Sequence, residues 1–167
     1  MRPFFYLFFI LFSLSLCNRL EAQTVLLENP LDKILPYPYA KAGSFILMED
    51  GSRGVYIEGE MKSRFFFFWI PEQKWKGKNI RVSIEAKGES LSRNFLFGIQ
   101  NKDAATGKDR WDGSQTASGT FEWKKFILDL PMKNKPVKGA LTIRIGMQQT
   151  TGKLFLRNFK AITLSEK

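Results

Sequence analysis

The sequence predicts an all-β protein: one antiparallel β-sandwich domain behind a cleaved N-terminal signal peptide. Runs rich in Phe, Ile, Val, Leu and Thr are separated by Gly, Pro and Asp-Gly turn signals about every 8–12 residues, a spacing typical of sandwiches and barrels. Several runs alternate between apolar and polar residues, and no long segment has helical periodicity. A length of 167 residues agrees with a single domain.

The N-terminal segment predicts export. One basic residue, Arg2, precedes an apolar run that ends at Leu16, and a polar stretch follows, which is the layout of a secretory signal peptide. The run is shorter than the roughly 17–25 apolar residues of a membrane span. Because the small residue Ala22 suits signal peptidase, we expect residues 1–22 to be removed and residues 23–167 to form the mature β-sandwich domain.

A lipid anchor is the alternative to cleavage after Ala22. Residues 14–17 resemble a bacterial lipobox that would lipidate Cys17, but only in part, because Leu16 stands where such motifs usually have a small residue. We favour cleavage after Ala22. A chain without further cysteines is typical of bacterial export, since small extracellular animal domains usually contain disulfides. We expect a secreted, periplasmic or cell-surface protein.

Composition argues against catalysis and against a cofactor. Histidine is absent, which removes the commonest general acid–base group and the commonest metal ligand. The single cysteine excludes an internal disulfide and a thiolate metal cluster. A glycosidase would need two facing carboxylates, and the sequence places no two of its candidates together. The candidates are Glu85, Asp109, Asp112, Glu122 and Asp129.

Alternation predicts strands that cover a core on one side and face water on the other. Residues 80–87 place Ile, Val, Ile and Ala on one face and Arg, Ser, Glu and Lys on the other, and residues 141–148 follow the same pattern. Two further inward rows are expected, which consist of Phe95, Phe97 and Ile99 and of Phe126, Leu128 and Leu130.

The run from Arg64 to Ile70 contains four consecutive phenylalanines followed by Trp69 and is apolar on both faces. We expect a central strand that is covered on both sides. The alternative is that one of its faces is an exposed aromatic platform.

Several segments together resemble a known family. In order and spacing they are similar to the galactose-binding-like jelly rolls, which include carbohydrate-binding modules attached to bacterial glycanases, over roughly Ser44–Leu164. The resemblance implies two antiparallel sheets, with ligands on a concave sheet face or on loops at one end, and it implies a packing role for Trp123. The segments are Trp75–Gly88, Gly119–Phe126, Ala140–Gln148 and Thr151–Ile162.

One departure from the family pattern concerns calcium. Many relatives have paired aspartates in the last strand that help hold a structural Ca²⁺, whereas this chain has Arg157 and Asn158. Ca²⁺ takes about six to eight oxygen ligands, and Arg157 would repel it. Glu28 lacks the partners that such a site needs. We therefore expect no bound calcium.

Trp111 is the leading candidate for stacking on a sugar ring. It lies in the polar segment 102–118, which we expect to be a loop, and loops carry function more often than cores do. The alternative is that Trp111 folds back and caps the end of the sandwich. Trp75 precedes a Gly turn and is expected to plug a loop. Planar polar side chains beside Trp111 that could bind sugar hydroxyls are Arg110, Asp112 and Gln115.

The polar faces of the alternating strands supply further candidates. Arg81 and Glu85 share one strand, Gln100 ends a second and Arg144 lies on a third. If these strands are neighbours, they form a polar groove. The alternative is an ordinary solvated face on which these charged groups pair across strands.

The net charge of +10 falls to +9 when the signal peptide takes away Arg2, Arg19 and Glu21. A basic exported protein attracts anionic surfaces, but the lysines are scattered and no nucleic-acid-binding motif is present. Our leading hypothesis is a non-catalytic exported module that binds carbohydrate or an anionic glycan surface, with no transmembrane segment in the mature chain and no nucleic-acid partner. The alternative is a structural or protein-interaction sandwich of the bacterial envelope.

Overall fold

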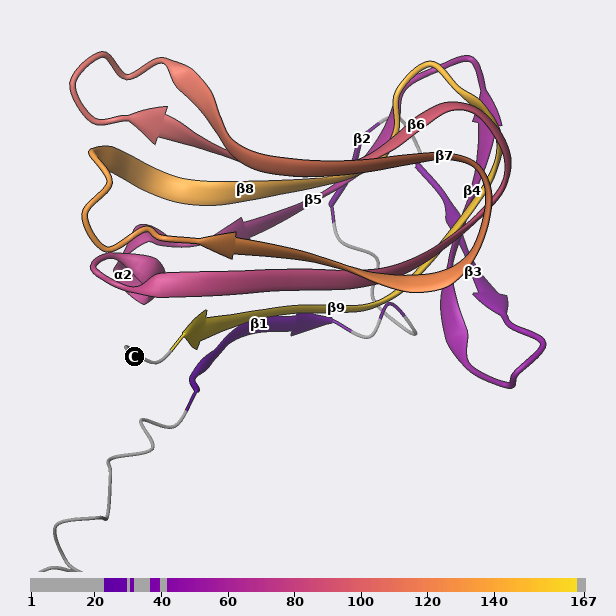
Figure 1. The fold of residues 1–167 in the computed structure, drawn as a ribbon, viewed down its shortest axis with the longest axis horizontal. Helices are drawn as coiled ribbons and strands as arrows, with labels where there is room; N and C mark the ends of the chain where they lie inside the picture. The colour runs from indigo at the N-terminus through magenta and orange to yellow at the C-terminus, as the bar shows by residue number, and fades with distance from the viewer. Residues whose placement is uncertain (1–22, 30, 32–36, 40–41, 165–167) are drawn as a thin grey trace, which may run out of the picture.

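The structure, a computed structural model, describes residues 23–29, 31, 37–39 and 42–164. The predicted antiparallel sandwich is confirmed (Figure 1). The proposed signal peptide and Cys17 lie outside the described residues. The elements are β1 (Val25–Asn29), β2 (Tyr37–Tyr39), β3 (Ser44–Leu47), β4 (Arg53–Glu60), β5 (Arg64–Ile70), α2 (Glu72–Trp75), β6 (Asn79–Asp103), β7 (Asp109–Leu130), β8 (Val137–Met147) and β9 (Thr151–Leu164).

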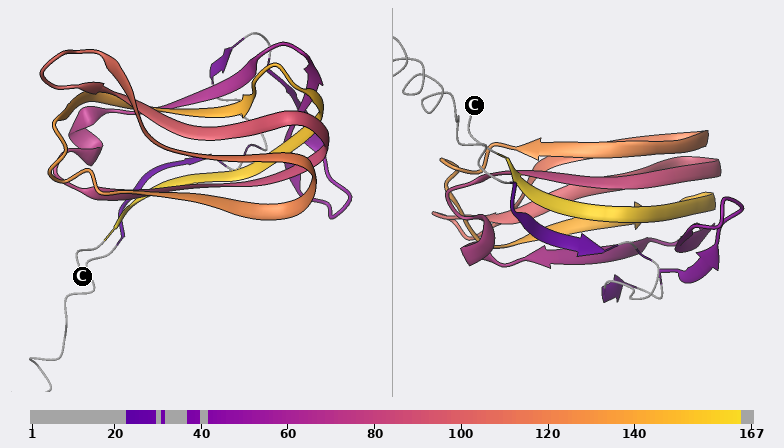
Figure 2. Two further views of the ribbon diagram at one scale, coloured as in Figure 1. Left: turned by 45° about the horizontal axis from the view of Figure 1, so that its top comes forward. Right: turned by 90° about the horizontal axis from the view of Figure 1, so that it is seen from below.

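Strands β6 and β7 each run through both layers of the sandwich. The first half of β6 pairs with β9 and with the second half of β7, so that Val82 lies between Ala161 and Leu128. The second half of β6 pairs with β8, as in Ile99–Ile143, and with the first half of β7. The first layer therefore has the order β7–β6–β9–β4–β3, with β1 also on β9, and the second has the order β7–β6–β8–β5–β2 (Figure 2).

The corner between the layers depends on an irregular ladder. The register of β6 against β7 shifts around Gly88 and Leu91, and such bulges bend a strand. Gly88 lies against the ring of Phe121, where an added Cβ would stand only 2.4 Å from the ring's Cε1. Nearby, the buried hydroxyl of Thr150 accepts a hydrogen bond from the Arg93 backbone N–H at 2.6 Å. A glycine and one hydroxyl thus let the paired strands turn.

The interior is apolar, and the predicted inward rows are confirmed. The ring of Phe68 in β5 stacks on that of Phe159 in β9, with 3.8 Å between centroids, so the two layers are in direct contact. Burying each such side chain contributes about 1.5–3 kcal/mol. Trp75, at the end of α2, is 1% exposed, as expected of a plug. The inward rows are Ile80, Val82, Ile84 and Ala86; Phe95, Phe97 and Ile99; Phe126, Leu128 and Leu130; and Leu141, Ile143, Ile145 and Met147.

Cross-strand ion pairs cover the outer face of the first layer. Arg81 donates two hydrogen bonds to Asp129, at 2.6 and 2.7 Å, and these lower the pKa of the Asp129 carboxyl. Arg157 donates to Glu85 at 2.8 Å and to Asp50 at 2.6 Å. The pKa of Asp50 is also well below its ordinary value, through the Ser52 hydroxyl first and Arg157 second.

These carboxylates predict how stability depends on pH. A carboxyl whose pKa is lower in the folded chain than in the unfolded chain stabilises the fold at pH values above its ordinary pKa, which is 3.8 for an aspartate. This contribution is lost as the pH falls toward the pKa of the folded chain. Since the chain has no histidine, we expect a constant Tm between about pH 6 and 8 and a decrease below about pH 4. Thermal unfolding followed by circular dichroism would measure this, and a fall between pH 8 and 6 would contradict it.

Candidate functional site

The outer face of the second layer carries a row of polar and aromatic side chains that crosses four strands. In register, Trp69 of β5 lies beside Thr142 of β8, which lies beside Gln100 of β6, which lies beside Trp111 of β7. We call this surface, with Phe67 and Arg144, the aromatic face; Phe65 lies on the same side of β5 but is buried beneath Arg144. Trp69 is 45% exposed and Trp111 is 44% exposed, so an exposed indole stands at each end of the row.

The side chains beside Trp69 stack on one another. The rings of Phe67 and Trp69 are stacked, with centroids 6.1 Å apart and an interplanar angle of 16°. The Arg144 guanidinium carbon lies 3.8 Å from the centroid of the Phe65 ring and 6.0 Å from that of Phe67. Arg144 thus forms cation–π contacts that hold its planar group along the surface.

Trp111 lies on a strand, and the expectation of a loop over residues 102–118 is wrong. The loop is only the turn between β6 and β7, because pairing with β6 resumes at Asp109. The Trp111 ring covers Gly98 of β6, where an added Cβ would stand 2.5 Å from the ring's Cζ3. Glycine at this position therefore lets the indole lie against the sheet.

Arg81 and Glu85 lie on the outer face of the other layer. Because β8 pairs only with the second half of β6, these residues do not share a groove with Gln100 and Arg144. Arg81 is bound to Asp129 and Glu85 to Arg157. The alternative expectation, that they pair across strands, describes them correctly.

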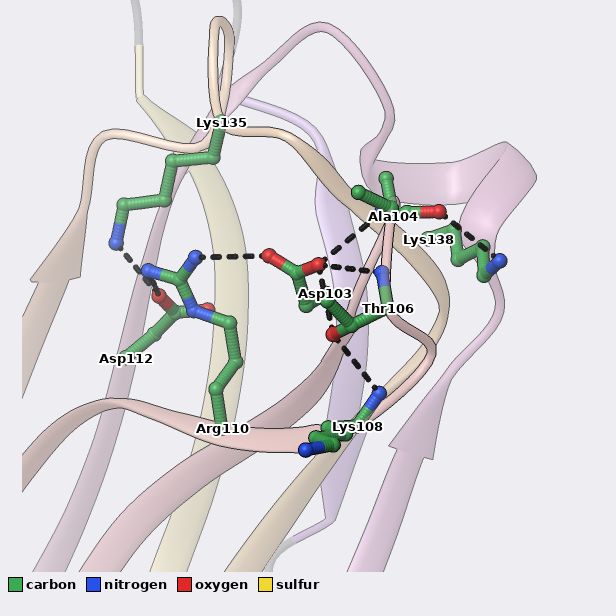
Figure 3. Close-up of polar contacts among 9 residues, drawn as sticks. Asp103, Ala104, Thr106, Lys108, Arg110, Asp112, Lys135 and Lys138 are labelled. Atoms are coloured by element: carbon green, nitrogen blue, oxygen red, sulfur yellow. Dashed lines mark hydrogen bonds and ion pairs between the residues drawn. The ribbon is translucent and has the colours of Figure 1, made fainter.

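Arg110 and Asp112 belong to an ion cluster at the end of the sandwich (Figure 3). The Asp112 side chain is wholly buried, and its Oδ1 lies 2.9 Å from the Lys135 ammonium and 3.2 Å from the Arg110 guanidinium. Arg110 also lies 3.9 Å from Asp103, whose carboxylate accepts hydrogen bonds from the backbone and hydroxyl of Thr106. The backbone bond is the main cause of the lowered pKa of Asp103. This cluster closes the end of the core.

Gln115 bridges the two layers at their open edge. Its side-chain oxygen accepts a hydrogen bond from the backbone N–H of Ile127 at 3.1 Å. The two residues lie on the two halves of β7, one in each layer.

Of the eight candidates from the sequence, the structure therefore brings together Trp111, Gln100 and Arg144.

Sequence reasoning placed Trp69 in a strand covered on both sides, and the exposure of this ring shows that the expectation was wrong for its outer face. The alternative, an exposed aromatic platform, describes that face. The signal was the run itself, since a strand with aromatic residues on both faces exposes one set if nothing covers it. Phe67 belongs to the same set and is half-buried.

Solved structures share this fold. The CBM22-1 xylan-binding domain of Paenibacillus barcinonensis Xyn10C matches with a TM-score of 0.60 at 10% identity, over 87% of this chain and 98% of that domain. A xylan-binding domain from CBM22 matches at 0.61 and 9%, over 86% and 97%. The C-terminal family 22 module of Clostridium thermocellum Xyn10B matches at 0.58 and 12%, over 85% and 96%. No protein-family model and no curated protein matches the sequence.

The chain folds as a carbohydrate-binding-module jelly roll. At this level of identity the likeness concerns the fold, which confirms the jelly-roll architecture implied by the sequence resemblance. Within the described part of this jelly roll, no helix has the length and apolar character needed to cross a bilayer.

The last strand of this jelly roll does not fit a calcium ion. Arg157 places its guanidinium between Asp50 and Glu85, so a cationic side chain already occupies the position between these carboxylates. Glu28 is held by Lys160, with 3.2 Å between oxygen and nitrogen. Among the described residues, no group of three or more acidic or cysteine side chains could hold a metal ion.

A chelator should therefore leave stability unchanged. We expect the same Tm with and without excess EDTA at constant ionic strength, because Arg157 supplies the positive charge that Ca²⁺ would otherwise provide. Differential scanning calorimetry would measure this. A fall of several degrees, reversed by added Ca²⁺, would contradict it.

The contact between Gly98 and the Trp111 ring allows the position of this ring to be tested. A methyl group in Gly98→Ala would clash with the indole and displace it, because the added Cβ would lie 2.5 Å from a ring atom. We expect a changed indole resonance and a red-shifted fluorescence, with the sandwich still folded. Gly113→Ala is the matched control, since its Cβ would be 3.5 Å from the nearest atom. Equal spectra for both variants would contradict this placement.

Proposed function

We propose that this protein is a non-catalytic, exported carbohydrate-binding module whose ligand lies across the aromatic face. The observation that carries the proposal is the row from Trp69 to Trp111, in which two exposed indoles flank Thr142 and Gln100. Sugar rings have an apolar face that stacks on aromatic rings and hydroxyl groups that require hydrogen-bonding partners. The row offers both.

The spacing of the row suits an extended ligand. Three interstrand steps separate the strands of Trp69 and Trp111, and these amount to roughly 14 Å. This span is longer than one pyranose ring, so an oligosaccharide across the strands could contact both indoles. Gln100 can donate and accept hydrogen bonds, Thr142 can do both through its hydroxyl, and Arg144 donates only.

The carboxylates of the aromatic face do not form a facing pair, which supports binding without hydrolysis. Among the described residues whose side chains share this face, the acidic one is Asp109, whose carboxylate lies 2.8 Å from the Lys102 ammonium, whereas glycoside hydrolysis by the usual route needs a pair of carboxylates. These positions are 65, 67 and 69 on β5, 142, 144 and 146 on β8, 96, 98, 100 and 102 on β6, and 109, 111, 114 and 116 on β7. Export is inferred from the N-terminal segment of the sequence.

The similar structures suggest the first ligand to test. Two of them are described as xylan-binding domains, and a third is a module of Xyn10B, which is described as an endo-1,4-β-D-xylanase, so xylan is a suitable first polysaccharide, beside cellulose and mixed-linkage glucan. The residues of the aromatic face form an open row across the strands rather than a closed pocket, and an open row suits a linear β-linked polysaccharide.

Removing either indole should weaken binding. We expect Trp69→Ala and Trp111→Ala each to lower affinity for a bound oligosaccharide by about tenfold or more, since exposed aromatic anchors dominate such interfaces. Ile127→Ala, an exposed apolar residue on the other layer, is the control and should bind as the natural protein does. Affinity electrophoresis in polysaccharide gels followed by calorimetry would measure this.

Two results would contradict the proposal. One is the absence of retention on every polysaccharide tested. The other is binding of a defined envelope protein that is neither inhibited by added sugars nor weakened in the two tryptophan variants. That result would favour a protein-interaction role.

A further inference from the structure

A concave site lies on the outer face of the first layer, opposite the aromatic face. The turn of the β3–β4 hairpin stands over this face and encloses an open pocket of about 400 Å³. Residues 46–50 form one wall, and Lys87, Trp123 and Phe155, from β6, β7 and β9, lie on the sheet side. The volume is in the range of about 300–1,000 Å³ that is usual for small-ligand sites. We call it the hairpin pocket.

The hairpin that forms the wall is held in place. Arg157 of β9 donates to the Asp50 carboxylate at 2.6 Å and to the Ser52 hydroxyl at 2.7 Å, while its Nε donates to Glu85 of β6 at 2.8 Å. Within the turn, Asp50 also accepts from the Ser52 backbone N–H at 2.9 Å, and Met48 closes a backbone hydrogen bond to Ser52 at 2.8 Å. The pocket therefore exists before a ligand enters.

Five of the ten residues that line the hairpin pocket are apolar or aromatic. Trp123 is half-buried, and the Arg157 guanidinium carbon lies 4.1 Å from its ring. Phe155 packs on Tyr56, with ring centroids 5.3 Å apart. Leu47, on the hairpin, is 67% exposed and lines the same pocket from the opposite side.

The rim of the pocket carries charges of both signs. The Lys87 ammonium lies 3.5 Å from Glu89 and 3.8 Å from Glu122, contacts that are longer than hydrogen bonds. Glu49 also lines the pocket. These groups retain capacity to donate to and accept from a ligand. A rim of mixed sign does not favour a simple anion or cation, whereas a neutral ligand with many hydroxyl groups can bind both kinds of group.

We propose that the hairpin pocket is a second sugar-binding site, in which a sugar ring packs between Leu47 and the aromatic side chains and its hydroxyl groups bind Lys87 and Glu122. The ligand class rests on the proposed function, while the site is separate from the aromatic face. Because the two sites lie on opposite outer faces, one molecule would bridge two polysaccharide chains. Such bridging raises the apparent affinity for an insoluble polysaccharide above that of either site alone.

The experiment separates the two sites by nuclear magnetic resonance. The protein is titrated with xylohexaose, cellohexaose and a mixed-linkage tetrasaccharide, while backbone and indole amide signals are followed. In the Trp69→Ala/Trp111→Ala double variant, we expect saturable shifts at residues 46–50 and at Trp123. Leu47→Ser should lower the oligosaccharide affinity obtained from these shifts at least fivefold. Phe45→Ser, on the same strand and outside the pocket, is the matched control and should not lower it.

The outcomes distinguish this inference from the proposed function. Shifts on the aromatic face without shifts at the hairpin pocket would overturn the second site alone. Shifts at the hairpin pocket without any on the aromatic face would overturn the first. Both sets, with Leu47→Ser weakening only the hairpin shifts, would support two sites, and the natural protein should then cross-link soluble polysaccharide into a turbid suspension that Leu47→Ser does not form.

Discussion

The whole arrangement depends on two strands that belong to both layers. Since β6 is paired with β9 along its first half and with β8 along its second, the bend between the halves determines how the layers face each other. At this bend Gly88 leaves room for the Phe121 ring, and the Thr150 hydroxyl accepts a hydrogen bond from a backbone N–H. The same bend places the aromatic face and the hairpin pocket on opposite sides of one core.

The arginine side chains are used in two different ways. Arg81 and Arg157 are held by carboxylates on the first layer, and Arg110 lies between Asp103 and Asp112 at the end of the sandwich. These groups connect strands, a hairpin and a turn. Arg144 instead lies along the rings of the aromatic face. A guanidinium over an aromatic ring keeps its hydrogen-bonding edge directed along the surface, which suits contact with a hydroxyl-rich ligand.

Much of the fold could be predicted from the sequence, because a half-buried strand must alternate. The inward rows of β6 and β8 were identified on this basis, whereas the plug formed by Trp75 was predicted from the Gly turn that follows it. The segment around Trp111 could not be assigned to a strand, because it is polar and is interrupted by Gly107 and Gly113. Pairing with β6 makes it extended, and the Trp111 ring then covers Gly98, a contact between residues on two different strands.

The candidate site was predictable only in part for a related reason. The sequence by itself determined the residue types, the alternation and hence which side chains of each strand point the same way. Only the tertiary structure decided which strands are neighbours, so that Trp69, Gln100, Arg144 and Trp111 share one face while Arg81 and Glu85 lie on the other. Alternation is a local property of the backbone, whereas the partner of each strand depends on the bend in β6 and on packing between residues far apart in the chain.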